Sequence, residues 1–177
     1  MKKMFAFVIG LCVSLTMFAQ DLNDLRKLAE QGNAEAQYRI GERYYVGDGV
    51  TLSYENAIVW FKKAAEQGNV DAQRDLGICY LILKSEKESA YWTEKAAEQG
   101  DESAQFNLAE YYYHGVGVKK SYNDAVKWYK KAAEKGSAGA QEGLARCYYN
   151  GEGVKQDYKQ AADWYKKALE TTEKRLR

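Results

Sequence analysis

The apolar side chains of the chain recur at helical spacing, and the same arrangement is used four times. Each copy is marked by a glutamine. Small or apolar residues stand one position before this glutamine and three, four and seven positions after it, which places them on one face of an α-helix. The marker residues, spaced by 36, 32 and 36 positions, are Gln37, Gln73, Gln105 and Gln141. A period of this length predicts an array of helix pairs that bury their apolar faces against their neighbours.

A second helix follows in every copy and is marked by a tryptophan. A small residue stands three positions before each tryptophan and an alanine four positions after it, so the pattern predicts an apolar stripe directed towards the first helix. We expect the four tryptophans to lie in this stripe: Trp60, Trp92, Trp128 and Trp164. Each second helix is expected to begin at a side chain suited to capping, namely Ser53, Ser85, Ser121 or Asp157.

Glycines separate the copies. A glycine that can end a helix is followed each time by a residue that can cap the next one, and these capping residues are Asn33, Asn69, Asp101 and Ser137. The predicted division is an N-terminal capping helix at 20–32 and four repeats at 33–68, 69–100, 101–136 and 137–177, the last with a C-terminal helical extension. The second repeat is four residues shorter, because Leu81-Ile82-Leu83-Lys84 replaces the Gly-x-Gly turn of the other copies.

The first nineteen residues differ from the rest of the chain. Lys2 and Lys3 precede an apolar run that ends at Phe18, and Ala19 follows it. This order is typical of a secretory signal peptide, and the apolar run is short for a membrane-spanning helix. We expect cleavage near Ala19, a secreted or periplasmic protein, and no stable membrane span afterwards. Lipidation at Cys12 and a retained membrane anchor are the alternatives.

Charge and cysteine content narrow the function classes. The formal net charge is +1, with basic and acidic residues interleaved, so no basic surface for nucleic acid is visible. Cys79 and Cys147 occupy the same position two repeats apart. Stacked helices would hold them too far apart for a disulfide, and we interpret them as small core residues.

The recurring motif resembles a known repeat. Leu-Gly-x-x-Tyr, Gly-x-Gly-Val and Ala-x-x-Trp-x-x-Lys-Ala-Ala-x-x-Gly follow one another, most fully in residues 108–136 and 144–168. They resemble the Sel-one-like repeat family, which is related to the tetratricopeptide repeat. The resemblance implies an all-α fold, a right-handed superhelical solenoid of about four helix pairs with an N-terminal capping helix. It also implies an adaptor role in protein complexes. The cysteine pairs of the disulfide-linked secreted relatives are missing here.

The first helices carry the candidate binding residues. Positions one, five and eight after each marker glutamine lie within about 60° of one another on a helix, away from the core face. In the related superhelices this side is concave. Aromatic anchors flanked by charges suit a groove for a peptide, although the aromatic residues at the eighth position could instead pack against the next repeat. The twelve candidates are Tyr38, Glu42, Tyr45, Arg74, Ile78, Leu81, Phe106, Glu110, Tyr113, Glu142, Arg146 and Tyr149.

Catalytic signals are absent from the sequence. The Gly-x-Gly segments lack the lysine and the preceding strand of a phosphate loop, and His114 is the only histidine. We therefore predict a non-catalytic adaptor that binds a partner protein or peptide on its concave face, without a cofactor, a metal or nucleic acid. The alternative is a cell-envelope hydrolase or a protein that binds cell-wall glycan, peptidoglycan or β-lactams, suggested by the leader and by Glu42, Glu110 and Glu142. A passive structural module is the third possibility.

Overall fold

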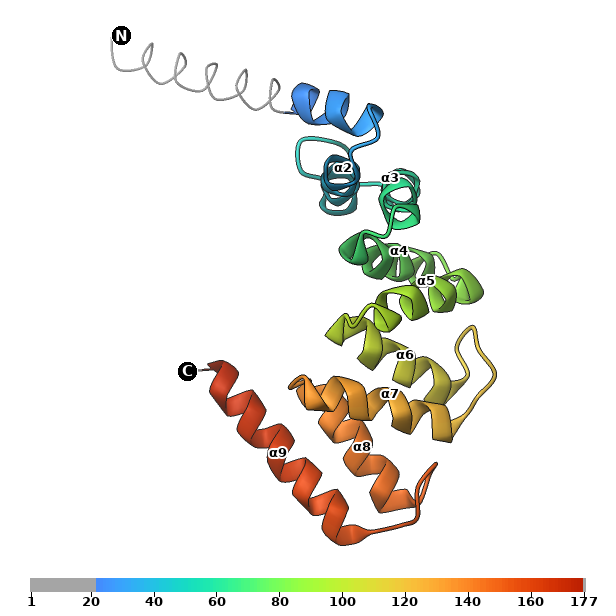
Figure 1. Cartoon of the computed structure of the whole chain (residues 1–177), viewed down its shortest axis with the longest axis vertical. Helices are drawn as coiled ribbons and strands as arrows, with labels where there is room; N and C mark the ends of the chain where they lie inside the picture. Colours follow the sequence, from blue (N-terminus) through green and yellow to red (C-terminus); the bar gives the residue numbers. More distant parts are fainter. Residues whose placement is uncertain (1–21, 177) are drawn as a thin grey trace, which may run out of the picture. The chain divides into compact units, whose positions relative to one another are not determined.

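A computed structural model describes residues 22–176, and within this range the regular structure is entirely helical. The predicted signal peptide, its cleavage site and Cys12 lie outside the described residues. A helix at 22–30 comes first. The helices that follow it form four pairs, α2 (Ala34–Val46) with α3 (Tyr54–Glu66), α4 (Val70–Ile82) with α5 (Glu86–Glu98), α6 (Glu102–His114) with α7 (Tyr122–Glu134), and α8 (Ala138–Asn150) with α9 (Tyr158–Leu176). Figure 1 shows this order.

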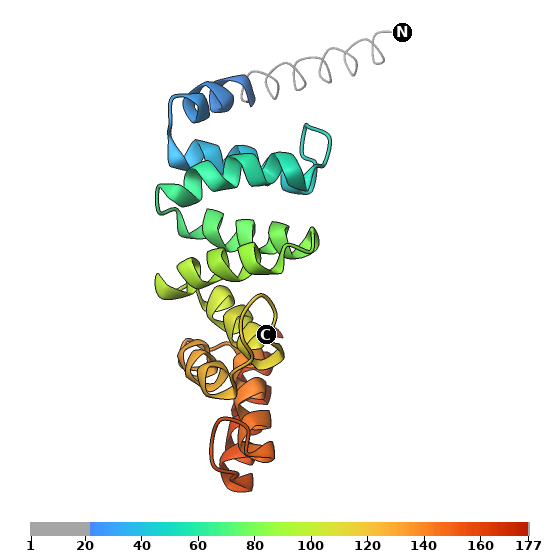
Figure 2. The ribbon, with the colours of Figure 1, turned by 90° about the vertical axis from the view of Figure 1, so that its right-hand side faces the viewer.

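The chain divides into two compact units, with the boundary between Asn69 and Val70. The first contains the N-terminal helix, α2 and α3, and the second contains α4 to α9. The two helices of each pair pack side by side, as the views in Figures 1 and 2 agree. The predicted all-α architecture, with four helix pairs after an N-terminal helix, is therefore confirmed.

The missing four residues of the second repeat are lost from its loop. Its helices α4 and α5 keep the same length of 13 residues as α2 and α3. Only residues 83–85 join α4 to α5, whereas residues 47–53 join α2 to α3. The deletion therefore leaves the packed surfaces of the pair in register.

Lys84 makes this short turn with a backbone that glycine normally supplies. Its φ is +59°, and it is the only non-glycine residue with positive φ in the described chain. The left-handed conformation costs an L-residue about 1–2 kcal/mol. We expect Lys84→Gly to raise the free energy of unfolding by about 0.5–1 kcal/mol, since glycine relieves this strain but adds entropy to the unfolded chain. Urea unfolding would measure the gain. Lys87→Gly, inside α5, is the control and should lower stability, and a loss of stability with Lys84→Gly would contradict the assignment of strain.

Capping side chains begin most of the helices where the sequence predicts. Asn33 Oδ1 accepts a hydrogen bond from the Ala36 amide at 2.9 Å, and Asp101 Oδ1 accepts one from the Ala104 amide at 2.7 Å. The prediction is wrong for the side chain of Ser85, which makes no capping bond. The short turn before α5 leaves Ser85 at ψ 72°, outside the extended conformation that capping requires. Ser137 also makes no capping bond with its side chain, although its backbone is extended.

Each unit has its own core. In the first, Ala29 of the N-terminal helix packs with Ala36 and Ile40 of α2, so this helix covers the apolar face of α2. In the second, fully buried small residues of α6, α7 and α8 surround Tyr129 and Leu144. Small side chains allow the helices to approach closely, as the glycine and alanine positions of the repeat predict.

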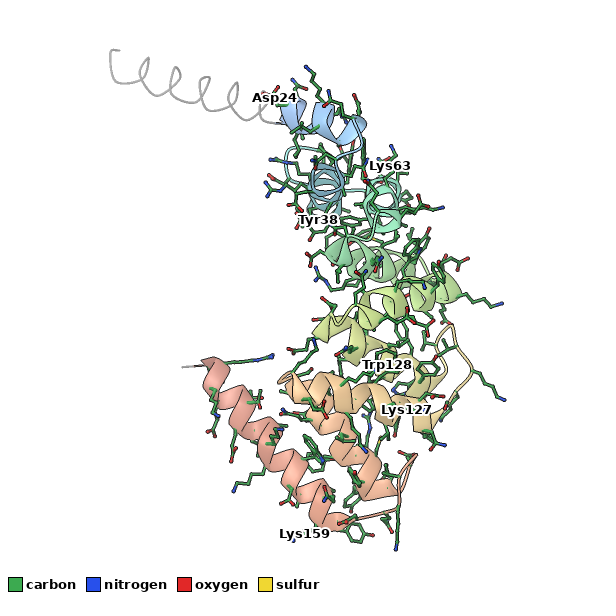
Figure 3. The ribbon with its side chains drawn as sticks, in the orientation of Figure 1. Asp24, Tyr38, Lys63, Lys127, Trp128 and Lys159 are labelled. Atoms are coloured by element: carbon green, nitrogen blue, oxygen red, sulfur yellow. The ribbon has the colours of Figure 1, made fainter. Side chains whose placement is uncertain are left out.

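The tryptophans lie at the edge of the core, which corrects the expectation that they fill the inward stripe. Trp128 packs against the core cluster but is only half-buried. Figure 3 labels this side chain on α7. The deeper position is the next residue, where Phe61, Thr93 and Tyr129 are buried. The reason is that α7 packs against both α6 and α8, so a second stripe of the helix is buried as well.

In three of the four second helices, the second lysine of a Lys-Lys pair lies over the ring of the tryptophan. Lys131 Nζ lies 3.8 Å from the centroid of Trp128, and Lys63 and Lys167 make the equivalent contacts with Trp60 and Trp164 at 4.1 and 4.7 Å. A cation over an indole face contributes about 0.5–1 kcal/mol at an exposed site. These lysines therefore cover the outer edges of the half-buried tryptophans.

The second glycine of a Gly-x-Gly turn touches the start of the preceding second helix in two places. Gly117 has φ +66°, and a Cβ atom added there would overlap the backbone carbonyl of Glu86. Gly153 has φ +72°, and its Cβ atom would overlap the backbone carbonyl of Tyr122. The conformation and the close approach both require glycine. The interpretation as turn glycines is confirmed, and these turns also connect neighbouring repeats of the second unit.

Cys79 and Cys147 are buried and unpaired, as predicted. Burial raises the pKa of the Cys79 thiol to about 12, and the nearby charge of Asp75 adds to this rise. Burial likewise raises the pKa of Cys147 to about 11. Both side chains are therefore protonated at neutral pH and act as small apolar residues of the core.

Candidate functional site

Part of the predicted binding surface closes around a hollow of about 270 Å³ in the second unit. Phe106 and Glu110 come from α6, and Glu142 and Arg146 come from α8. All four belong to the candidates that the sequence singled out. The other lining residues are Gly139, Gly143 and Tyr165.

Helical spacing brings these side chains together. Phe106 and Glu110 stand four residues apart on one face of α6, as Glu142 and Arg146 do on α8. The two glycines of α8 leave its backbone bare on the same side. A Cβ atom at Gly139 would lie 3.1 Å from Phe106 Cζ, so the phenyl ring lies almost on the backbone of α8.

Glu110 and Arg146 are joined by the hydroxyl of Tyr129. Arg146 Nη2 donates to Glu110 Oε1 at 3.2 Å and to the Tyr129 hydroxyl at 3.0 Å, while that hydroxyl donates to Glu110. His114 Nε2 lies 3.3 Å from the other carboxylate oxygen of Glu110. Desolvation lowers the pKa of Arg146, but Tyr129 and Glu110 outweigh it, and the net pKa is raised. The guanidinium is therefore charged, and its two partners are fixed on α6 and α7.

Arg146 is held in place at some cost. Its guanidinium carbon lies 4.3 Å from the centroid of the Tyr113 ring, a cation–π contact. Its Nε atom is buried and has no hydrogen-bond partner among the described residues. An unsatisfied buried donor costs about 1–3 kcal/mol, and such donors are rare in native structures.

Glu142 differs from Glu110 because it is exposed and has no hydrogen bond or ion pair within residues 22–176. Its carboxylate stands at the rim of a hollow that has aromatic rings, Phe106 and Tyr165, among its lining residues. The site thus offers apolar surface, the ion pair between Glu110 and Arg146, and the carboxylate of Glu142, which has no partner in residues 22–176.

The aromatic residues eight positions after the marker glutamine pack inside their own repeats. Tyr113 lies 5.0 Å from Tyr122 in an edge contact, and the pairs Tyr45–Tyr54 and Tyr149–Tyr158 are similar at 5.6 and 5.3 Å. Packing against the next repeat is the alternative to a groove for these aromatic residues. The rings of Tyr45, Tyr113 and Tyr149 do pack against other side chains. Their ring contacts with Tyr54, Tyr122 and Tyr158 are with the second helix of the same pair.

Tyr113 makes an additional contact with the following repeat. Its hydroxyl donates to Glu152 Oε2 at 2.6 Å. Burial and this hydrogen bond raise the pKa of Tyr113 to about 12, and the same bond lowers the pKa of Glu152. Tyr113 does not line the hollow, but it contacts Arg146, which does.

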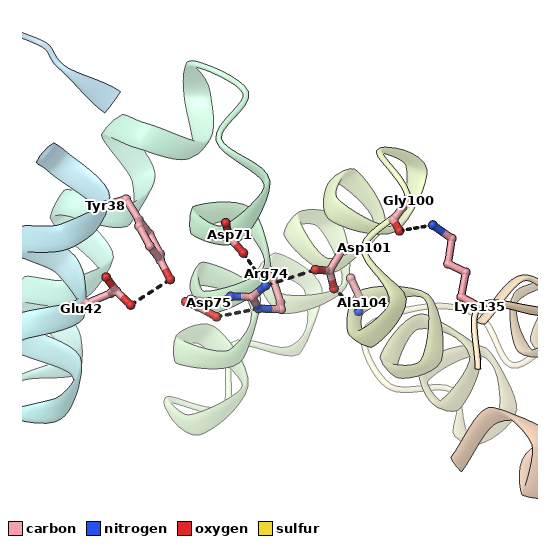
Figure 4. A network of polar contacts seen from close by, with 9 residues as sticks. All are labelled: Tyr38, Glu42, Asp71, Arg74, Asp75, Gly100, Asp101, Ala104 and Lys135. Atoms are coloured by element: carbon pink, nitrogen blue, oxygen red, sulfur yellow. Dashed lines mark hydrogen bonds and ion pairs between the residues drawn. The ribbon is translucent and has the colours of Figure 1, made fainter. Parts of the chain in front are cut away.

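The guanidinium of Arg74 forms ion pairs that stabilise the fold, so this candidate does not present a free charge to a ligand. It reaches Asp71 at 2.6 Å, Asp75 at 2.9 Å and Asp101 at 3.1 Å, as Figure 4 shows. Burial lowers the pKa of Arg74, but the three carboxylates, Asp75 foremost, outweigh it and raise the pKa overall. Because Asp101 also caps α6, this cluster ties α4 to α6. Further along α4, Ile78 is half-buried and Leu81 is exposed.

In the first unit, Tyr38, Glu42 and Tyr45 lie on α2. The Tyr38 hydroxyl donates to Glu42 Oε1 at 3.0 Å, and the Tyr38 ring lies 5.7 Å from Phe61. A larger hollow of about 500 Å³ includes Glu42 but no aromatic residue, and its lining residues are Leu25, Glu35, Arg39, Glu42, Arg43, Val46 and Asp48. Most of its charges pair with one another, as Arg39 does with Glu35. We therefore regard the smaller hollow of the second unit as the better candidate.

The sequence reasoning missed several residues of this site. Tyr129 and Tyr165 follow the tryptophans of their repeats, and Phe61 does the same, so an aromatic residue after tryptophan was a visible signal. Gly139 and Gly143 stand two residues before and after Gln141. The other repeats have larger polar residues at both places, so a pair of glycines at positions that are polar in the other repeats was a signal specific to α8.

Comparison with known families identifies the repeat. The Sel1 repeat matches four times in succession, at residues 34–69, 70–101, 102–137 and 138–170. The chain belongs to the Sel1 repeat family. Sel1-repeat proteins are generally scaffolds for protein–protein interaction and typically non-catalytic.

Solved structures of similar proteins support the fold. The Sel1-repeat chain is 38% identical to c5321, a protective antigen of uropathogenic Escherichia coli with an SLR fold, with a TM-score of 0.79 over 84% of this chain. It is 37% identical to a Sel1 repeat protein from Oxalobacter formigenes, with a TM-score of 0.77 over 85%. Helicobacter pylori cysteine rich protein B is 25% identical over 71% of this chain and 92% of its own, with a TM-score of 0.53.

The chain spans 33% of the length of the Escherichia coli protein and 63% of that from Oxalobacter. A search of curated proteins finds no match. Among residues 22–176, no helix combines the length and apolar character needed to cross a bilayer. The same part of the chain holds no group of three or more His, Cys, Asp or Glu side chains arranged for a metal ion.

Proposed function

We propose that this Sel1-repeat chain is a non-catalytic adaptor, and that it binds a peptide segment of a partner protein at the hollow of the second unit. The observation that carries the proposal is the convergence of Phe106, Glu110, Glu142 and Arg146, which were selected as exposed positions of two helices in different repeats. The family's general role in protein–protein interaction supports the same function.

The chemistry of the hollow favours one kind of peptide. Apolar rings provide most of the affinity in such sites, and charged groups fix the register of the bound segment. Phe106 and Tyr165 supply the rings. Arg146 already has Glu110 as its partner, whereas Glu142 is open to a ligand. The preferred peptide therefore has an aromatic or large apolar side chain next to a lysine or arginine.

The remaining candidates would play secondary parts. Leu81 and Tyr149 keep 40% and 55% of their surfaces exposed and can extend the contact along the second unit. Arg74 and Tyr113 act mainly by holding α4, α6 and the following turn in place. If the leader is cleaved as we propose, the partner is an envelope or extracellular protein.

The test is selection of binding peptides from a random displayed library with the purified chain, followed by counter-selection with a variant. Glu142→Lys reverses the open charge without touching the core, and we expect it to weaken binding of the selected peptides at least about tenfold, or about 1.4 kcal/mol. The selected peptides should combine an aromatic residue with a basic one.

Glu134→Lys is the matched control, because Glu134 is exposed on α7 and does not line the hollow. It makes the same change of charge and should leave binding unaltered. Peptides that bind equally well to the Glu142→Lys and Glu134→Lys variants would place the binding surface elsewhere. Circular dichroism of both variants would confirm that the helices remain intact.

A further inference from the structure

α9 carries a row of exposed residues on one face that is separate from its charged side. They follow one another at alternating intervals of four and three, which places them in a single stripe along the helix. The stripe consists of Tyr158, Ala162, Tyr165, Leu169, Thr172 and Leu176. Three of its large side chains are strongly exposed, Tyr158 at 62%, Leu169 at 66% and Leu176 at 84%.

The equivalent stripe on α7 is buried by another helix. Val126, Tyr129 and Ala133 occupy there the positions that Ala162, Tyr165 and Leu169 occupy on α9, 36 residues later. The three residues of α7 are almost fully buried, because α8 packs on them with the bare backbone of Gly143 against the Tyr129 ring. Tyr158 has an edge contact with Tyr149 of α8, but within the described chain no helix packs on this stripe of α9 as α8 does on α7. α9 therefore presents a surface that in this fold receives a helix.

We infer that the stripe of α9 binds the same stripe of a second copy of the chain, with the two helices antiparallel. A centre of symmetry at residue 167 gives a consistent register. Tyr165 then meets Leu169 of the second copy, and Tyr158 meets Leu176. The small residues Ala162 and Thr172 meet each other, so every large side chain is matched in size.

The charges beside the stripe favour this direction. Lys159 lies near the start of α9 and Glu173 near its end, on the same edge of the stripe. Antiparallel pairing brings Lys159 of each copy next to Glu173 of the other. In a parallel pair, residues on the same edge lie on opposite sides of the contact, so Lys159 and Glu173 would form no such ion pair. At the centre of the pair, Lys166 approaches Lys166 of the second copy. Each of these lysines lies 4.0 Å from Glu170 of its own helix, and this carboxylate offsets its charge.

A single helix pair buries less surface than a typical permanent dimer, and we therefore expect a reversible dimer with a dissociation constant in the micromolar range, roughly 1–100 μM. Sedimentation velocity of the full chain over this range of concentrations measures it. Leu169→Glu should weaken the dimer at least tenfold, because it places a charge at the centre of the apolar contact. Val59→Glu is the matched control, since Val59 is 51% exposed on another second helix. It should leave the dimer unchanged.

The direction of pairing is tested by exchange of the two charges. Lys159→Glu and Glu173→Lys should each weaken the dimer several-fold, and the double variant should restore it, because the pair is then re-formed in the reverse order. A monomer at all concentrations, or a dimer insensitive to Leu169→Glu, would overturn the inference. Failure of the double variant to restore the dimer would overturn the antiparallel register. Tyr165 belongs to both the stripe and the lining of the hollow, so a bound peptide and the second copy compete for this ring. Leu169 does not line the hollow, so Leu169→Glu should weaken the dimer and leave peptide binding intact, which distinguishes the two proposals.

Discussion

Replacement of Tyr129 by alanine is expected to lower the free energy of unfolding by about 3–5 kcal/mol. Its side chain is fully buried, and its ring packs near Phe106 and Tyr113, with centroid distances of 6.3 and 6.5 Å. The truncation leaves a cavity between three helices. It also removes the hydroxyl that joins Glu110 to Arg146. Equilibrium unfolding in urea, followed by circular dichroism, would measure the loss.

Two variants separate the causes of this loss. Tyr129→Phe keeps the ring and should cost only about 1–2 kcal/mol, from the unsatisfied polar partners. Burial raises the pKa of Tyr129, and the carboxylate of Glu110 raises it further, so the hydroxyl is protonated and acts as the donor. Tyr165→Ala truncates the equivalent but 42% exposed residue and should cost about 1 kcal/mol or less. Equal losses at Tyr129 and Tyr165 would contradict the burial described here.

Replacement of Gly153 by alanine is expected to cost about 3 kcal/mol or more. Two effects add at this position. The backbone has φ +72°, which is strained for an L-residue, and the new methyl group would overlap the Tyr122 carbonyl and the Asn123 amide. The start of α7 cannot move away easily, because Ser121 caps it. Thermal and urea unfolding should show the loss together.

Gly136→Ala isolates the first of these effects. Gly136 has φ +98°, but a Cβ atom there would meet no atom within 4 Å. It should therefore cost only the strain of the left-handed backbone, about 1–2 kcal/mol. The difference between the two variants measures the close contact of the turn with α7. If Gly153→Ala and Gly136→Ala cost the same, that contact contributes nothing to stability.

The architecture was predictable because the repeat encodes it several times over. The four marker glutamines are all buried, and the glycines that precede each repeat have positive φ, as expected of residues that terminate helices. Because the same small and apolar residues recur in each copy, a position that is ambiguous in one copy can be interpreted from the same position in the others. The second repeat shows this well, since its helices form despite the changed turn at Lys84.

The binding surface was less predictable because it depends on how one repeat lies against the next. Angular position on a single helix identified Phe106, Glu110, Glu142 and Arg146 as a group. Angular position did not predict that Arg74 forms ion pairs with three carboxylates. Such partners come from other turns and other helices, and the spacing within one helix contains no information about them.

The core depth of the aromatic residues was misjudged for a similar reason. The conspicuous tryptophan of each repeat suggested the deepest position, but a helix packed on two sides buries two stripes. Tyr129 is buried between α6 and α8, while Tyr165 has a helix on one side only among the described residues. Identical positions in the repeat thus differ in exposure according to their place in the array.

The two buried cysteines provide the array with internal reporters of local opening. Cys79 and Cys147 occupy the same position in the second and fourth repeats, and each thiol is shielded and protonated in the folded chain. A thiol reagent can modify either one only after its repeat has opened. The ratio of the two modification rates therefore compares the opening free energies of two repeats within one molecule, without any introduced label. The two thiols therefore report which of the second and fourth repeats unfolds locally at the lower free energy.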